Sequence, residues 1–225
     1  MFGSSRVWSV TAQSDPPFFE AEFREQLRQL FRWRRDVRHF REDPVREDEL
    51  LELLQTAHAA PSVGNSQPWR IIRVTDPEIR QAVASHVDHC NREAAQKYEV
   101  AEQEEYRKLK LHGLREAPVQ LVFYCDRTAE AGRGLGRQTM ARTLEWSVVM
   151  AIHSLWLAAR ARGLGLGWVS ILEPAALGEL LGVAPEWELV GYICLGYPLE
   201  AEEQPELERL RWQPRLPLSD ILFER

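Results

Sequence analysis

The sequence predicts an α+β sandwich built around one hydrophobic core. Two apolar patterns occur along the chain: stretches with the spacing of an amphipathic helix, and short runs rich in β-branched and aromatic residues. Helices and strands that are mixed without strict alternation favour this class over a parallel α/β sheet. With 225 residues, of which 44% are hydrophobic, the chain is long enough to bury a sizeable core in one domain.

The elements are expected in the following order. Residues 1–15 are small and polar and predict a flexible leader, which leaves residues 16–225 as a single domain. Helices are expected at 18–33 and at 47–60, where Pro61 ends the pattern. The highly charged stretch 77–111 also predicts helix, and residues 99–110 within it are either a solvated helix face or a mobile cover over a site. Strands are expected at 69–74, 119–125, 167–172 and 189–195, with a short helix at 174–181.

The longest helical pattern, residues 143–162, is apolar on nearly every face. A helix that is apolar all round is buried, and a chain of this size can hardly cover it alone. The pattern therefore predicts burial between two subunits of an obligate homodimer. Gly163 follows the pattern and is expected to cap the helix C-terminus.

Composition restricts the possible partners. The net charge is −6, whereas nucleic-acid-binding proteins are usually basic, so no nucleic acid is expected. Cys90, Cys125 and Cys194 are widely spaced without a CxxC pair, which disfavours a disulfide framework and favours a cytoplasmic location. The longest apolar stretch, residues 148–159, is too short to span a bilayer, which needs roughly 20 residues, so no membrane association is expected.

The first candidate site is Arg-Arg-Asp-Val-Arg at residues 34–38. Guanidinium groups match phosphate oxygens in geometry, so Arg34, Arg35 and Arg38 predict an anion site. The same positive charges are expected to keep Asp36 ionised. A solvated run of charges is the alternative that this cluster leaves open.

The second candidate is Pro-Ser-Val-Gly-Asn-Ser-Gln-Pro-Trp at residues 61–69, between the second helix and the first strand. Amide side chains such as Asn65 and Gln67 can pair with the edge of a heteroaromatic ring. An ordinary turn, with Gly64 and Pro68 as breakers, explains the composition equally well.

The third candidate is the glycine-rich segment 163–170. Its GxGxG string invites a dinucleotide-binding interpretation, but that fingerprint follows a strand and opens a helix. These glycines follow a helix and open a strand, so we reject that interpretation. Instead, Gly165 and Gly167 are expected to let the backbone approach a flat ligand, with Ser170 in the strand beyond.

Other motifs exclude further classes of site. His86, His89 and Cys90 could share a helix face, but no further ligands with matching spacing accompany them, so no metal site is expected. The glycines at 132–136 lack the GK[ST] of a phosphate-binding loop, and no G-x-S-x-G motif supports a hydrolase.

Taken together, these segments resemble the nitroreductase superfamily over nearly the whole chain. The shared order is a helix, RRDVRHF, a helix, APSVGNSQPW and a strand, then a buried helix, GLGLGWVSIL and a basic C-terminal segment. Residues 110–121, 125–126 and 136–140 are similar to the 5,6-dimethylbenzimidazole synthase branch of that superfamily. Asp36 and Ser170 match the two positions tied to catalysis in that branch, and general nitroreductases usually have serine at the first.

The resemblance implies a homodimeric nitroreductase-like α+β fold, in which helices flank a central, mostly antiparallel sheet. It also implies two FMN sites at the interface, each built by both subunits, with Asp36 and Ser170 catalytic. The implied FMN-binding residues are Arg34, Arg35, Asp36, Val37, Arg38, Trp168, Val169, Ser170 and Arg215, with Ser62, Asn65 and Gln67 from the partner chain.

The implied reaction consumes reduced FMN as a substrate. Dioxygen reacts with it, and the isoalloxazine is fragmented to 5,6-dimethylbenzimidazole, the lower ligand of vitamin B12, with release of erythrose 4-phosphate. NAD(P)H would be an indirect electron source, through a separate flavin reductase.

Two other functions stay open. A general NAD(P)H-dependent nitroreductase or flavin reductase would keep FMN as a bound cofactor, and Asn65-Ser66 resembles that group. A non-catalytic flavin-binding protein would bind FMN tightly without forming a product.

Overall fold

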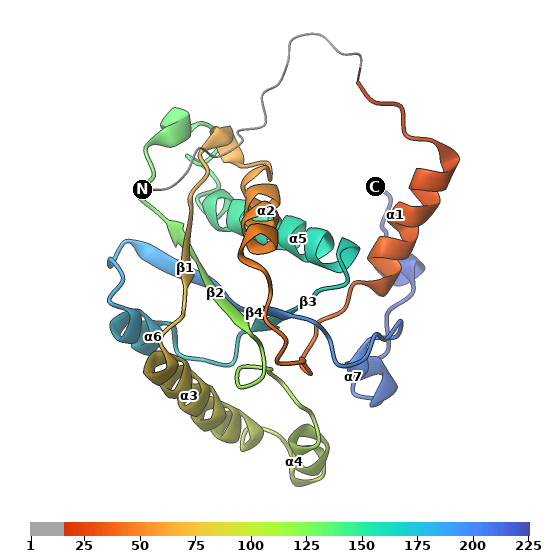
Figure 1. The fold of residues 1–225 in the computed structure, drawn as a ribbon, viewed down its shortest axis with the longest axis vertical. Helices are drawn as coiled ribbons and strands as arrows, with labels where there is room; N and C mark the ends of the chain where they lie inside the picture. The colour runs from red at the N-terminus through yellow and green to blue at the C-terminus, as the bar shows by residue number, and fades with distance from the viewer. Residues whose placement is uncertain (1–15) are drawn as a thin grey trace.

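The computed structural model describes residues 16–225, and the leader expected at 1–15 lies outside them. A four-stranded antiparallel sheet with strand order β1-β2-β4-β3 forms the centre, and helices flank it (Figure 1). The strands are β1 (Trp69–Arg73), β2 (Val119–Asp126), β3 (Gly165–Val169) and β4 (Trp187–Gly196). This architecture confirms the predicted α+β class and the antiparallel sheet.

The helices cover both faces of the sheet (Figure 1). Helices α2 and α5 pack on one face, and α3 and α6 pack on the other, so each face has its own apolar cluster. Strand β2 is central, and all eight of its residues are buried. The helices are α1 (Ala21–Trp33), α2 (Glu47–His58), α3 (Pro77–Ala95), α4 (Val100–Arg107), α5 (Thr143–Ala161), α6 (Pro174–Leu181) and α7 (Glu206–Arg209).

The charged stretch expected as one helix at 77–111 is two helices, so that prediction is wrong in part. Helix α3 begins at Pro77 after the Asp76 side chain caps two backbone N–H groups, and it ends at Ala95. Helix α4 then follows a short break. Its Tyr106 is buried against the ring of Trp212, at 6.0 Å between centroids, and this contact anchors α4 on the C-terminal segment. Most other described residues of α4 are exposed, as expected for a solvated face, and a role as a mobile cover stays a prediction.

Helix α5 is buried on one side only within the single chain. Val148, Ile152 and Leu155 are fully buried against α2 and the sheet. On the opposite side Trp146 and Val149 are 48% and 40% exposed. The single chain therefore leaves an apolar face of α5 uncovered, and the expected homodimer stays a prediction. Gly163 ends the helix with φ +77°, which confirms its predicted capping role.

Two glycines of β3 allow residues 36–38 to lie against the strand. A Cβ atom on Gly165 would come within 2.6 Å of the Val37 side chain, and one on Gly167 within 2.1 Å of the Val37 carbonyl oxygen. The expectation that these glycines let the backbone approach a flat ligand is corrected, because the group they admit is the chain's own Val37.

Replacing Gly167 with alanine is therefore expected to destabilise the fold. The added Cβ has no space beside the Val37 carbonyl, so the 36–38 segment must shift, at a cost of about 1–3 kcal/mol. Urea unfolding measures the change. Gly178→Ala is the matched control, because a Cβ there meets only a Val183 methyl group at 3.4 Å. Equal unfolding midpoints for wild type and Gly167→Ala would contradict the steric argument.

Candidate functional site

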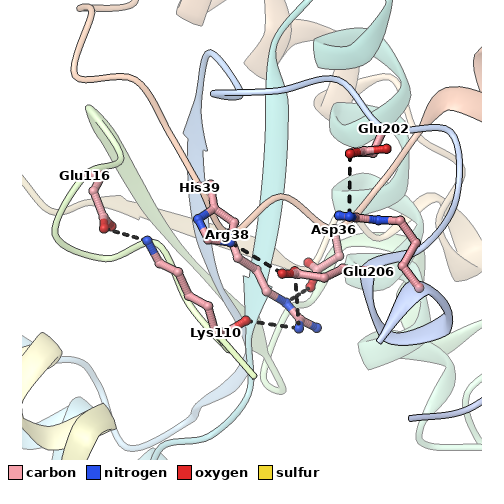
Figure 2. Close-up of polar contacts among 8 residues, drawn as sticks. Asp36, Arg38, His39, Lys110, Glu116, Glu202 and Glu206 are labelled. Atoms are coloured by element: carbon pink, nitrogen blue, oxygen red, sulfur yellow. Dashed lines mark hydrogen bonds and ion pairs between the residues drawn. The ribbon is translucent and has the colours of Figure 1, made fainter. Parts of the chain in front are cut away.

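Asp36 lies at the free edge of β3 and is held by both of its carboxylate oxygens. The chain forms a short parallel bridge here, in which the Val37 N–H donates to the Leu166 carbonyl at 3.0 Å. Asp36 Oδ1 accepts a hydrogen bond from the Trp168 N–H at 2.9 Å. Its Oδ2 accepts one from Arg38 Nε at 3.0 Å (Figure 2). Strand β3 and Arg38 therefore fix the orientation of this carboxylate.

The ionisation of Asp36 differs from the expectation based on its arginine neighbours. Burial raises the pKa of Asp36, and this effect outweighs the lowering by the Trp168 N–H, Arg38 and Arg34. The prediction that the three arginines would dominate is wrong, because Arg38 alone of them bonds to the carboxylate. A carboxyl group with a raised pKa exchanges protons more readily near neutral pH.

Two of the three predicted phosphate-binding arginines are bonded within the protein. Arg35 donates from Nε to the Glu203 carbonyl at 2.6 Å and also to the carbonyls of Arg32 and Arg34. Arg38 donates from Nη1 to the Lys110 carbonyl at 3.1 Å. These contacts connect residues 35–38 to the C-terminal segment and to the segment that follows α4.

Arg34 is the arginine of this cluster that stays available for an anion. Its guanidinium lies over the ring of Trp156, 4.6 Å from the centroid, and Trp156 Nε1 donates to the Arg35 carbonyl at 3.0 Å. Burial lowers the pKa of Arg34, and Arg215 lies close enough to lower it further. Among residues 16–225, neither Arg34 nor Arg215 forms an ion pair, although the charge of Asp36 acts on Arg34 and raises its pKa. Two like charges so placed favour a bound anion.

A cavity of about 380 Å³ opens beside Asp36 and Trp156. Its volume is within the range of roughly 300–1,000 Å³ that is typical of small-molecule sites. Its lining includes residues 35–39, Trp33 and Trp156, and segment 198–202 closes the other side.

The loop at 61–69 has more internal structure than an ordinary turn. Ser62 Oγ accepts from the Gln67 N–H at 3.0 Å, and Gln67 Nε2 donates to the Asn65 carbonyl at 2.7 Å. Asn65 and Gln67 both have positive φ, at 56° and 43°, a costly conformation that is often found at functional sites. The Val63 N–H donates to Ser147 Oγ at 3.0 Å, which fixes the loop to the first turns of α5.

The first and second candidate sites do not meet within one chain. The loop contacts α5 at Ser147, whereas Arg34 contacts it at Trp156, nine residues later. At 1.5 Å per residue these contacts are about 14 Å apart along the helix. Within one chain the cavity beside Asp36 is lined by no residue of the 61–69 loop, so the two candidate sites are separate.

The third candidate is only partly placed as expected. Strand β3 spans 165–169 rather than 167–172, so Ser170 lies after the strand and is exposed, and its expected place within the strand is wrong. Trp168 is partly buried, with its ring against Gly191, and Val169 is buried in the core, so it can offer only its backbone. Ser170 follows Trp168, whose backbone N–H bonds Asp36, by two residues.

The remaining motifs form no further site. His86 Nε2 accepts a hydrogen bond from the Glu173 N–H at 2.9 Å, and His89 pairs with Glu93. Across residues 16–225 no group of three or more His, Cys, Asp or Glu side chains is arranged to hold a metal ion. No helix in this range is long and apolar enough to cross a membrane.

The sequence pattern does not single out three contributors to the site: Trp156, Glu206 and the Lys110 carbonyl. Trp156 could be noticed only as one apolar residue in a helix already rich in them. Glu206 and Lys110 reach Arg38 through tertiary contacts, so sequence spacing gives no signal for them.

Comparisons with known proteins identify relatives of this chain. The model of the Nitroreductase family matches residues 31–197. The 5,6-dimethylbenzimidazole synthase of Rhodospirillum rubrum is 53% identical over 89% of this chain and 95% of its own. A 5,6-dimethylbenzimidazole synthase of Rhodobacter capsulatus is 46% identical over 88% of this chain and 96% of its own.

Solved structures show the same fold at lower identity. An oxidized iodotyrosine deiodinase bound to FMN and 3-iodo-L-tyrosine superposes with a TM-score of 0.68 at 22% identity, covering 88% of this chain and 97% of that one. An NADPH:FMN oxidoreductase from Vibrio harveyi complexed with NAD⁺ gives 0.65 at 24% identity, covering 87% of this chain and 75% of that one.

Proposed function

Because the chain belongs to the nitroreductase family, we propose that it is a 5,6-dimethylbenzimidazole synthase that fragments reduced FMN in a dioxygen-dependent reaction. Synthases at 53% and 46% identity, which it matches almost from end to end, support this activity. The structural observation that carries the proposal is the Asp36 carboxylate, held by β3 and Arg38 at the rim of a cavity.

The residues of the site fit FMN with its terminal phosphate. Arg34 and Arg215 place two positive charges together, neither in an ion pair among the described residues, which suits a dianion. The ring of Trp156 holds the Arg34 guanidinium by a cation–π contact. Arg35, Val37 and Arg38 shape the cavity wall, and we assign direct phosphate contact to Arg34 and Arg215.

Arg34→Met is expected to weaken FMN binding about tenfold to a hundredfold, because it removes a charge-assisted hydrogen bond to phosphate. Riboflavin lacks the phosphate, so its affinity should change little. Fluorescence titration with both flavins measures the effect. Arg92→Met, on exposed α3, is the matched control and should leave both affinities unchanged. Equal losses for FMN and riboflavin would argue against a phosphate contact by Arg34.

The complete site requires a second copy of the chain in our proposal. Arg34 and the 61–67 loop contact α5 about 14 Å apart, so Ser62, Asn65 and Gln67 of the partner subunit would complete each cavity. The uncovered apolar face of α5 supplies the surface for such a homodimer. Residues 16–225 would then form one FMN-binding domain per subunit. The free cysteines support a cytoplasmic location.

When bound, reduced FMN supplies both the electrons for dioxygen and the carbon atoms of the product. The protein contributes position and proton transfer. Asp36, whose pKa is raised by burial, holds or accepts a proton at Oδ2 or Oδ1. The exposed hydroxyl of Ser170 would offer a hydrogen bond to the bound flavin. NAD(P)H enters only indirectly, through a separate flavin reductase that supplies reduced FMN.

The deciding experiment is incubation with excess reduced FMN in air, followed by chromatography for 5,6-dimethylbenzimidazole. The product should form in air and should be absent from an anaerobic control.

A general NAD(P)H-dependent nitroreductase is the second candidate, because Asn65-Ser66 and a 29% identical NADH dehydrogenase of Thermus thermophilus favour it. Oxidation of NAD(P)H by a nitroaromatic acceptor, without any benzimidazole product, would replace our proposal with that function. Tight FMN binding without either reaction would instead indicate a flavin-binding protein.

A further inference from the structure

We infer that Arg38 is a positioning residue for the Asp36 carboxylate, and that Glu206 and the Lys110 carbonyl hold Arg38 in place. This inference rests on the proposed function in so far as Asp36 serves the reaction. It assigns Arg38 a role different from that of its neighbour Arg34, although both belong to one arginine-rich segment.

The Arg38 guanidinium lies at the meeting point of three chain segments (Figure 2). Its Nε donates to Asp36 Oδ2 at 3.0 Å, and its Nη1 donates to the Lys110 carbonyl at 3.1 Å. Nη1 also lies 3.8 Å from Glu206 Oε2 on α7. The Arg38 side chain is only 11% exposed, so these contacts are shielded from solvent.

These contacts direct the Arg38 donors toward protein acceptors. Arg34 and Arg215 converge elsewhere, with Arg34 stacked on Trp156. A planar guanidinium can bond Asp36 through one edge and the Lys110 carbonyl through another, whereas a lysine has a single point of charge. The geometry therefore suits an orienting group better than a phosphate ligand.

The supports of Arg38 come from segments outside β3. Lys110 lies in the connection between α4 and β2, and its ammonium is paired with Glu116 at 2.6 Å. Glu206 is in α7 and also lies 3.4 Å from His39 Nε2. A displacement of α4 or of the C-terminal segment would consequently alter the support of the Asp36 carboxylate.

Several charged or polar groups face Asp36 and set its proton affinity. Arg34 and Arg38 flank it on its own segment, and the Trp168 N–H approaches from β3. Glu206 of α7 acts across Arg38, and Cys194 of β4 lies near enough to be influenced by Asp36. Because Arg38 favours the ionised carboxylate, its removal should raise the pKa of Asp36.

The test compares Arg38→Met, Arg38→Lys and Glu206→Gln with wild type. Arg38→Met should lower the rate of product formation at saturating reduced FMN about tenfold, the effect of losing a hydrogen bond to a charged group. The acid limb of its pH–rate profile should move to higher pH, while FMN affinity stays close to wild type. Arg38→Lys should restore part of the rate. Glu206→Gln removes one support of Arg38 and should lower the rate by less than Arg38→Met.

Arg41→Met is the matched control, because Arg41 also bonds an aspartate two residues away through Nε, but at the exposed surface. It should leave the rate, the pH profile and FMN affinity unchanged. A loss of FMN affinity in Arg38→Met as large as that in Arg34→Met, with an unchanged pH profile, would overturn the inference and make Arg38 a phosphate ligand.

A carboxyl ¹³C titration of aspartate-labelled protein decides the question without using the reaction. The Asp36 resonance is assigned by its absence in Asp36→Asn, and its titration should move to higher pH in Arg38→Met. An unchanged titration overturns the inference whatever the enzyme makes. A shifted titration in a protein that forms no benzimidazole supports the inference and refutes only the proposed function.

Discussion

Asp36→Asn should lose most formation of 5,6-dimethylbenzimidazole, by at least about 100-fold, while FMN still binds. General acid–base groups contribute factors of this size, and asparagine cannot take up or release a proton. The amide oxygen can still accept from the Trp168 N–H, so β3 should keep its contact with the 36–38 segment. Arg34 and Arg215 are unaffected by the change and should still bind the phosphate.

Single-turnover mixing of reduced FMN with dioxygen measures this prediction. The product is quantified by chromatography, and flavin absorbance follows reoxidation in the same sample. Reoxidation should continue in the variant, because that step needs no carboxylate, so intact oxidised FMN should be recovered. Asp43→Asn is the control, since Asp43 is exposed and bonds Arg41 away from the cavity. Product formation by Asp36→Asn at the wild-type rate would leave Asp36 as a structural partner of Arg38.

The raised pKa of Asp36 also gives the substitution a pH-dependent effect on stability. A carboxyl group whose pKa is higher in the folded state than in the unfolded state binds its proton more tightly when folded. The stability that Asp36 contributes is complete at pH values below its pKa in the unfolded protein. It is lost as the pH rises through its pKa in the folded protein. As the pH rises through that interval, the free energy of unfolding of wild type, measured in urea, should therefore fall relative to that of Asp36→Asn.

The sequence predicts the elements of this fold well where local pattern decides the outcome. Helical spacing of apolar residues identifies α2, and a long pattern that is apolar on nearly every face identifies α5. The β-rich runs identify β1 and β2 to within one residue. The break between α3 and α4 is missed, because the charged residues around it suit a helix and the stop depends on packing against Trp212.

The site is predicted less completely, for a physical reason. The arginine cluster is evident from the sequence, but each guanidinium points to acceptors that come from distant segments. Arg35 reaches Glu203, Arg38 reaches Lys110, and Arg34 stacks on Trp156. The sequence predicts that the glycines of β3 allow a close approach to the backbone. The group that approaches is Val37, which only the tertiary structure brings there.

Val149→Arg should abolish both dimer formation and FMN binding. Val149 is 40% exposed in the single chain, so arginine there can remain solvated and the monomer should still fold. Across a twofold interface the same change would bury two unpaired positive charges, each of which costs several kcal/mol. The dimer dissociation constant should thus rise by at least about a thousandfold. FMN affinity should fall with it, since within one chain no residue of the 61–67 loop lines the cavity beside Asp36.

Sedimentation equilibrium and FMN titration across a range of protein concentrations measure the two losses together. Val100→Arg is the matched control, because Val100 is 79% exposed on α4, far from the α5 face, and should leave both properties unchanged. FMN affinity of the wild type should itself fall on dilution through the dissociation constant, since assembly and ligand binding are linked by mass action. A folded wild-type monomer at micromolar concentration, or a monomeric Val149→Arg that binds FMN as tightly as wild type, would show that one chain contains the whole flavin site.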